Sequence, residues 1–227
     1  MRSPGGVRKG VGRPPNGPKP GVSHLRRPRV RPHDGVHVTV RLRGGRPSLR
    51  TLQAGAVLRT CFQKGRDRFG FRLVQFAVMG NHLHLVAEAD DARSLARGMQ
   101  GLCVRFARRL NRLHGRHGKV FADRYFAHVL TNPTAARKTL VYVMQNARKH
   151  GLLANLDEAM YRRGAPPVAD PYTSAAYFDG WSIAPRFLGP RREGAPPVTA
   201  PLGWLLTQGW RRADPGPIHP SELPAGA

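Results

Sequence analysis

The chain has 227 residues and carries 38 lysines and arginines against 13 acidic residues, a formal net charge of +25 at pH 7. This length suits one domain with flanking tails, and the positive charge indicates a polyanionic partner, with nucleic acid favoured over acidic lipid. No apolar run approaches the roughly 18 residues of a membrane span, and the basic N-terminus does not resemble a signal peptide. Cys61 and Cys103 lack C-x-x-C spacing, which favours buried thiols in a reducing cytoplasm over a disulfide or zinc framework.

The first 33 residues form a distinct segment that contains no acidic residue and is dense in Gly, Pro, Arg and Lys. We predict a disordered basic arm over residues 1–33, because such a segment buries too little apolar surface to offset its ordering entropy. Within it, Gly12-Arg13-Pro14 resembles a minor-groove hook in which Arg13 inserts into DNA. A solvated tail with diffuse attraction to phosphates is the commoner alternative.

Residues 34–153 are predicted to form the main domain, with elements in the order β-α-β-β-α-β-α. Strands are expected at residues 37–42, 71–78, 82–88 and 120–130. Helices are expected from Pro47-Ser48 to Gly65, after Asp90-Asp91, and from Asn132-Pro133 to His150 with Gly151 at the C′ position. This order indicates an α+β fold, in which an antiparallel sheet has its helices packed mainly on one face.

The second predicted helix has an apolar face and a basic face. The basic face carries Arg97, Arg105, Arg108 and Arg112. In a chain of this charge, a solvated helix surface and contact with DNA phosphates both account for the pattern.

Residues 154–227 are predicted to be a partly ordered, Pro/Gly-rich C-terminal extension. Its aromatic residues include Tyr172, Tyr177, Phe178 and Trp181. These side chains could stack on unpaired bases, but anchoring of the extension on the domain is the interpretation we favour.

Two histidines, His82 and His84, occupy alternate positions of a predicted strand. Alternate strand residues face the same side, so both imidazoles project from one face and can share a divalent cation. An isolated H-x-H is more often a pair of ordinary surface or core histidines. The polar face of a downstream helix and the basic character of the chain favour a metal site here.

The last predicted helix places Tyr142 and Asn146 on one face, with Lys138 and Lys149 on the same stripe. An isolated tyrosine of this kind is usually a surface residue, but here the chemistry supplies a use. A bound Mg²⁺ or Mn²⁺, held by two imidazoles and an amide oxygen, would polarise a scissile phosphate. The lysines would favour phenolate and hold DNA phosphates. Attack by tyrosine would keep the phosphodiester energy in a covalent bond, which predicts nicking and rejoining.

Two stretches of the chain resemble the single-tyrosine HUH transposases, and among them the REP-associated tyrosine transposases. Residues 79–86, Met-Gly-Asn-His-Leu-His-Leu-Val, match the family pattern Met-Pro-Asn-His-hydrophobic-His-hydrophobic. Residues 142–152, Tyr-Val-Met-Gln-Asn-Ala-Arg-Lys-His-Gly-Leu, match Tyr-Ile-x-x-Asn-Pro-Val-Lys-Ala-Gly-Leu. Residues 121–129 also look like the aromatic strand that precedes this helix in the family. The resemblance spans about residues 36–153.

The resemblance implies a ferredoxin-like HUH fold in which His82 and His84 bind the metal and Asn146 is its third ligand. It implies that Tyr142 forms a 5′-phosphotyrosine link and leaves a free 3′-hydroxyl, at single-stranded DNA beside a hairpin. The chain departs from the family at Gly80, at Ala147-Arg148 and at His150, where Pro, Pro-Val and Ala are usual. Because of these departures, the sequence does not decide at which residue the helix ends.

The sequence therefore predicts a metal-dependent single-stranded DNA endonuclease and strand-transferase, a transposase. We expect it to act as a monomer or homodimer on chromosomal DNA in a bacterial cytoplasm. A non-catalytic binder of hairpin or single-stranded DNA with the same fold is the main alternative, since the charge serves binding equally well. An RNA-binding protein is a third interpretation, but charge alone would not require Tyr142 and Asn146.

Overall fold

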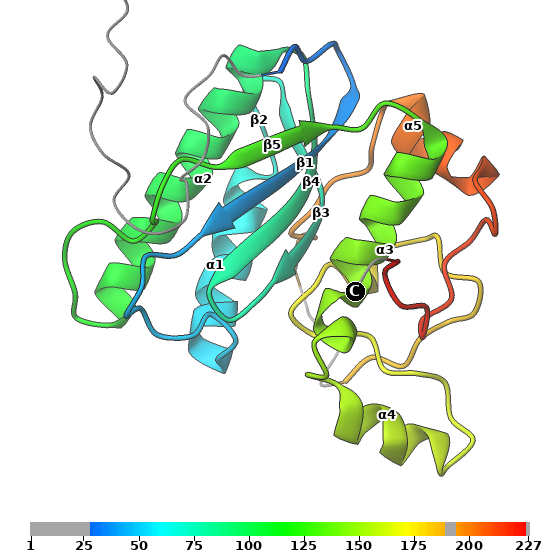
Figure 1. The fold of residues 1–227 in the computed structure, drawn as a ribbon. Coiled ribbons are helices and arrows are strands. Elements are labelled where there is room, and N and C mark those ends of the chain that lie inside the picture. Colours follow the sequence, from blue (N-terminus) through cyan, green and yellow to red (C-terminus); the bar gives the residue numbers. More distant parts are fainter. Residues whose placement is uncertain (1–27, 189–193, 226–227) are drawn as a thin grey trace, which may run out of the picture.

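The computed structural model describes residues 28–188 and 194–225, so Arg13 and most of the predicted basic arm lie outside the described residues. The described chain contains one five-stranded sheet in the order β2-β3-β4-β1-β5 (Figure 1). Its strands are β1 (Asp34–Arg41), β2 (Asp67–Arg68), β3 (Phe71–Val78), β4 (His82–Ala89) and β5 (Phe126–Val129). Every pair of neighbouring strands is antiparallel, which confirms the predicted α+β class and sheet type.

The main helices are α1 (Leu52–Gly65), α2 (Ala92–Leu113) and α3 (Pro133–Lys149). Shorter helical segments follow in α4 (Ala154–Tyr161), η1 (Ala175–Tyr177), α5 (Trp204–Thr207) and η2 (Gly209–Arg212). Helices α1 and α2 share one face of the sheet, as expected, whereas α3 covers the opposite face (Figure 1). The C-terminal extension packs partly on the α3 side and partly, through Tyr172, Tyr177 and Val198, against the α1/α2 core. Within the described residues, no helix is long and apolar enough to cross a bilayer.

Strand alternation separates these two faces. In β1, the side chains of Val36, Val38 and Val40 are buried in the core beneath α1 and α2. The residues between them, His37 and Thr39, therefore face α3. The same alternation in β4 sends its leucines to the α1/α2 core and its histidines toward α3.

The helix boundaries follow from local capping. Asn132 caps α3 by accepting a hydrogen bond from the Ala135 N–H at 2.8 Å, and Pro133 opens the first turn. Helix α3 ends at Lys149, and Gly151 follows with a φ of +69°, as the C′ position favours. Helix α1 begins later than the predicted Pro47, because the Thr51 side chain supplies its cap.

The fourth predicted strand is shorter than expected. Residues 120–130 were predicted as one strand, but only Phe126–Val129 pairs continuously with β1. Phe121 makes an isolated bridge to Leu42, and the Asp123 side chain then accepts a hydrogen bond from the Arg124 N–H at 2.7 Å. This local bond competes with strand pairing and accounts for the turn before β5.

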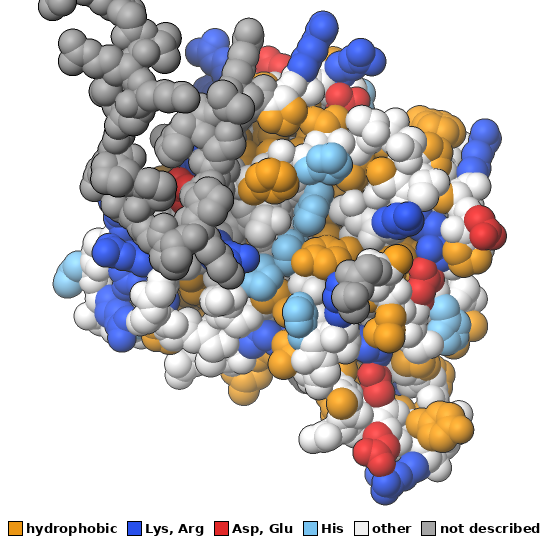
Figure 2. Space-filling view, in the orientation of Figure 1, with side chains coloured by type: hydrophobic (Ala, Val, Ile, Leu, Met, Phe, Trp, Pro, Cys, Tyr) orange, Lys and Arg blue, Asp and Glu red, His pale blue; other side chains and the backbone are white. Residues whose placement is uncertain are grey.

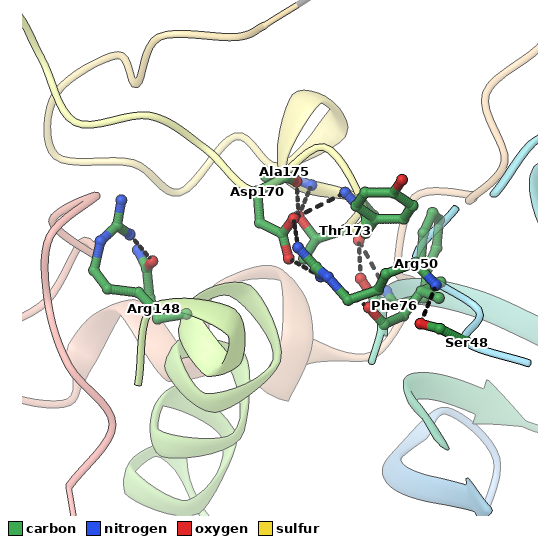
Figure 3. Close-up of polar contacts among 11 residues, drawn as sticks. Ser48, Arg50, Phe76, Arg148, Asp170, Thr173 and Ala175 are labelled. Carbon is green, nitrogen blue, oxygen red and sulfur yellow. Dashed lines mark hydrogen bonds and ion pairs between the residues drawn. The ribbon is translucent and has the colours of Figure 1, made fainter. Parts of the chain in front are cut away.

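The C-terminal extension is anchored on the sheet. Arg50 donates two hydrogen bonds of 2.8 Å to the buried carboxylate of Asp170 and lies over the ring of Tyr172 (Figure 3). The Phe76 N–H donates to the Ser174 hydroxyl at 2.8 Å, which ties the extension to β3. The aromatic residues of the extension thus serve as anchors, as we favoured from the sequence.

Helix α3 is held between the sheet and this extension. Arg137 forms a bidentate ion pair with Glu222, with distances of 2.7 and 2.8 Å. Arg148 forms a second bidentate pair with Asp157, at the same two distances, and also donates to the Val168 carbonyl oxygen. Three segments that follow α3 in the sequence therefore fix the position of this helix.

Candidate active site

The face of the sheet beneath α3 carries the two histidines of the H-x-H pair. The ring centroids of His82 and His84 lie 4.7 Å apart, so the two side chains are neighbours, as the alternation predicted. Asn81 accepts a hydrogen bond from Nδ1 of His82 at 2.7 Å. Figure 2 shows histidine side chains gathered along one line on this face of the molecule.

Tyr142 meets this pair from α3. Its hydroxyl oxygen lies 3.4 Å from Nε2 of His84, and the two ring centroids are 4.9 Å apart. The tyrosine is partly buried and lines an open cleft of about 290 Å³ with His37, Lys138, Thr139, Pro224 and Ala225. A nucleophile placed here is close to the histidines and still accessible to a substrate.

Asn146 lies one turn after Tyr142 on the same helix. Its side chain is fully buried, yet neither amide atom has a hydrogen-bond partner among the described residues. An unpartnered buried polar group costs about 1–3 kcal/mol and calls for an explanation such as a bound ion. An amide oxygen together with two imidazoles would be a donor set that suits Mg²⁺ or Mn²⁺.

The metal-binding interpretation depends on this amide. Within residues 28–188 and 194–225, no group of three or more His, Cys, Asp and Glu side chains is arranged to hold a metal. A three-ligand set that includes His82 and His84 would therefore need a ligand of another kind, such as the Asn146 amide. The unsatisfied amide fits that role, since it would gain the partner that the protein itself does not provide.

Burial keeps the histidines neutral. It lowers the pKa of His84 to about 3, with a further decrease from the neighbouring His37 and His82. Burial also lowers the pKa of His82, and Arg41 acts in the same direction. A neutral imidazole keeps the lone pair that can coordinate a metal.

Opposing effects act on the pKa of the Tyr142 phenol. Burial raises its pKa, while Asn146 and Arg41 act in the opposite direction, although neither amide atom of Asn146 makes a hydrogen bond of ordinary geometry. Lys149 lies 5.9 Å from the centre of the ring, and Lys138 lines the cleft. Neither lysine is among the groups that lower this pKa, so their stabilisation of the phenolate stays a prediction.

The predicted arginine face lies elsewhere. Helix α2 packs on the face of the sheet opposite to α3, so Arg97, Arg105, Arg108 and Arg112 lie across the sheet from Tyr142. Arg97 is placed over the ring of Phe69, 5.1 Å from its centre. Any contact between these four arginines and DNA would therefore take place away from Tyr142.

Three residues on the α3 face of the sheet were not singled out from the sequence. His37 on β1 contacts His84, while Phe126 and His128 on β5 lie opposite Thr39 and His37 respectively. Phe126 is 52% exposed and His128 is also exposed. The alternation of side chains along a strand could have identified them from the sequence. Within β1 and β5, these residues alternate with apolar side chains that are directed at the core.

Comparison with known proteins relates one segment of the chain to a family of transposases. The profile of the IS200-like transposases matches residues 36–146, which include both histidines, Tyr142 and Asn146. The structure of a REP-associated tyrosine transposase bound to a REP hairpin is similar in fold, with a TM-score of 0.55 and 17% identity, covering 80% of this chain and 100% of that one.

A crystal structure of a Deinococcus radiodurans R1 protein, described as a candidate transposase, has 17% identity and a TM-score of only 0.37. It covers 52% of this chain and 91% of its own length. No curated protein sequence matches the chain. Over residues 36–146, slightly less than half of its length, the chain is similar to the IS200-like transposases.

Proposed function

We propose that this protein is a transposase that cuts and rejoins single-stranded DNA, with Tyr142 as the nucleophile. The observation that carries the proposal is the 3.4 Å separation between the Tyr142 hydroxyl and Nε2 of His84, on a face that also holds the unpartnered amide of Asn146. Such a set of a hydroxyl nucleophile, neutral imidazoles and an amide suits metal-assisted phosphoryl transfer.

His82, His84 and Asn146 would hold a Mg²⁺ or Mn²⁺ ion. Such an ion would polarise the scissile phosphate and offset the charge that develops in the transition state. The chain supplies the remaining parts. Tyr142 is held against the histidines by α3, and Lys138 at the cleft is placed to bind a neighbouring phosphate.

In the proposed step, the Tyr142 oxygen forms a bond to phosphorus and the bond to the 3′ oxygen breaks. The phenol loses its proton and the departing 3′ oxygen gains one, so no net proton is consumed. The products are a 5′-phosphotyrosine link and a free 3′-hydroxyl. Attack of a 3′-hydroxyl on this link would regenerate Tyr142 and rejoin the strand without ATP.

Hairpin-flanked DNA is the proposed substrate. The net charge of +25 supports a nucleic-acid partner, and the structural neighbour is bound to a REP hairpin. Tyr142 contacts His84 of its own chain, which is the arrangement that a nucleophile acting in cis would use.

The test uses single-stranded oligonucleotides that contain a hairpin, labelled at the 5′ or 3′ end and incubated with the full-length protein and Mn²⁺. A denaturing gel should show a slowly migrating covalent complex that retains the 3′ label. Tyr142→Phe and EDTA should each abolish this band, whereas Tyr161→Phe should not, because Tyr161 is exposed on α4. Tight hairpin binding without a covalent band would identify a non-catalytic DNA-binding protein instead.

A further inference from the structure

His37 approaches the metal-binding pair from the neighbouring strand. Its Nε2 lies 3.2 Å from Nδ1 of His84, and their ring centroids are 5.3 Å apart. In the β1–β4 register, Thr39 is the residue directly opposite His84 and His37 is its diagonal neighbour. A long side chain reaches across such a diagonal, which explains how His37 contacts a residue 47 positions away.

The position of the His84 proton decides whether His84 can act as a ligand. A neutral imidazole carries one N–H, and the other nitrogen keeps its lone pair. Nε2 of His84 is the nitrogen that faces the Tyr142 hydroxyl, whereas Nδ1 faces His37 and, at 3.3 Å, the hydroxyl of Thr39. A proton on Nδ1 leaves Nε2 free, and a proton on Nε2 removes it as a ligand.

We propose that His37 is a positioning residue that holds His84 in its Nδ1–H form. In this arrangement, Nδ1 of His84 donates a hydrogen bond to the lone pair on Nε2 of His37, and Nε2 of His84 is directed at the reaction site. The assignment of a metal to that nitrogen rests on the proposed function. The tautomer itself is a property of the metal-free protein.

One further observation supports this role. Nδ1 of His82 is paired with Asn81 at 2.7 Å, so each histidine of the pair has a partner for Nδ1. A neutral imidazole, like the Thr39 hydroxyl, can either donate or accept, so the tautomer of His84 itself is what the experiment measures.

The experiment compares two replacements of His37 in full-length protein. His37→Phe keeps a ring but removes the acceptor, whereas His37→Gln has an amide oxygen that can replace Nε2. His128→Phe is the matched control, since His128 lies on the neighbouring strand and is exposed. Long-range ¹⁵N NMR of the protein in chelator reports which nitrogen of His84 is protonated, and titration with Mn²⁺ alone reports the affinity.

Wild-type protein, His37→Gln and His128→Phe should show the Nδ1–H form and similar Mn²⁺ affinity. His37→Phe should lose the pure Nδ1–H signature and bind Mn²⁺ about 10–100-fold more weakly, the usual effect of losing such a partner. An unchanged tautomer and affinity in His37→Phe would overturn the proposal. So would an Nε2–H signature in the wild type, which decides the question even if His37→Phe does not fold.

The result of this test of His37 can be distinguished from the result of the test of the proposed function. If the wild-type protein never forms a covalent DNA complex but shows the His37-dependent tautomer and Mn²⁺ affinity, the proposed cleavage fails and the role of His37 stands. If covalent complexes form while His84 carries its proton on Nε2 in the metal-free protein, cleavage stands and the role of His37 fails.

Discussion

The hydroxyl of Tyr142 and Nε2 of His84 are 3.4 Å apart, although 58 positions separate the two residues in the sequence. Tyr142 lies on helix α3 and His84 lies on strand β4, so no single element brings the two side chains together. The contact depends on α3 lying across the sheet, which the C-terminal extension enforces through Arg137 and Arg148.

Replacing Asn146 should separate stability from metal binding. In chelator, Asn146→Leu should raise the free energy of unfolding by about 1–3 kcal/mol, because it removes two unpartnered amide atoms from the interior. The same variant should lose Mn²⁺ binding and DNA cleavage. Urea titration checks the first effect and Mn²⁺ titration the second. A variant that is destabilised yet binds Mn²⁺ normally would contradict the role of this amide.

Stability should fall as the pH is lowered from neutrality. The folded protein holds the pKa of His37 at about 4 and that of His84 at about 3, whereas in the unfolded chain both lie near ~6.5. Below pH ~6.5 the unfolded state therefore binds more protons, and the free energy of unfolding decreases until the pH passes the folded pKa values.

Urea unfolding in chelator at several values between pH 7.5 and about 3.5 measures this dependence. His84→Gln removes one of the two groups and should make the decline shallower, while His117→Gln, at an exposed position, is the matched control. Equal slopes for His84→Gln and wild type would show that burial of His84 does not depress its pKa.

Breaking the anchor between Arg50 and Asp170 should cost far more than breaking an exposed ion pair. Arg50→Ala leaves the buried Asp170 carboxylate without its bidentate partner, for which a loss of about 3–5 kcal/mol is expected. Arg162→Ala removes a pair with Glu158 that is largely exposed and should cost at most about 1 kcal/mol. Urea midpoints at constant m-value compare the two. Similar losses would mean that the extension is not anchored through Asp170.

Phe126 should contribute to binding of single strands. Its ring is exposed on the edge strand β5 and lies opposite Thr39, beside the histidines. A base stacked on it would contribute about 1–3 kcal/mol, so Phe126→Ala should weaken the binding of a labelled single strand accordingly. Phe69→Ala is the control, because Phe69 is 57% exposed but adjoins β2 at the opposite edge of the sheet. Fluorescence anisotropy at fixed salt should detect the difference, and equal losses would contradict a local stacking role.

Local sequence signals were sufficient for the parts of the site that depend on one element. Alternation placed His82 and His84 on one face of a strand, and helical spacing placed Tyr142 and Asn146 on one face of α3. The Asn132-Pro133 cap and Gly151 marked the ends of that helix closely. These features follow from backbone geometry and capping, which are encoded within a few residues.

The tertiary structure alone decided what depends on packing between elements. It shortened the strand at residues 120–130, moved the α2 arginines across the sheet from Tyr142, and brought His37 to Nδ1 of His84. It also buried the Tyr142 hydroxyl enough to raise its pKa. Strand register and desolvation are set by residues far apart in the chain, so sequence spacing does not reveal them, whereas periodicity and caps are local and can be read directly.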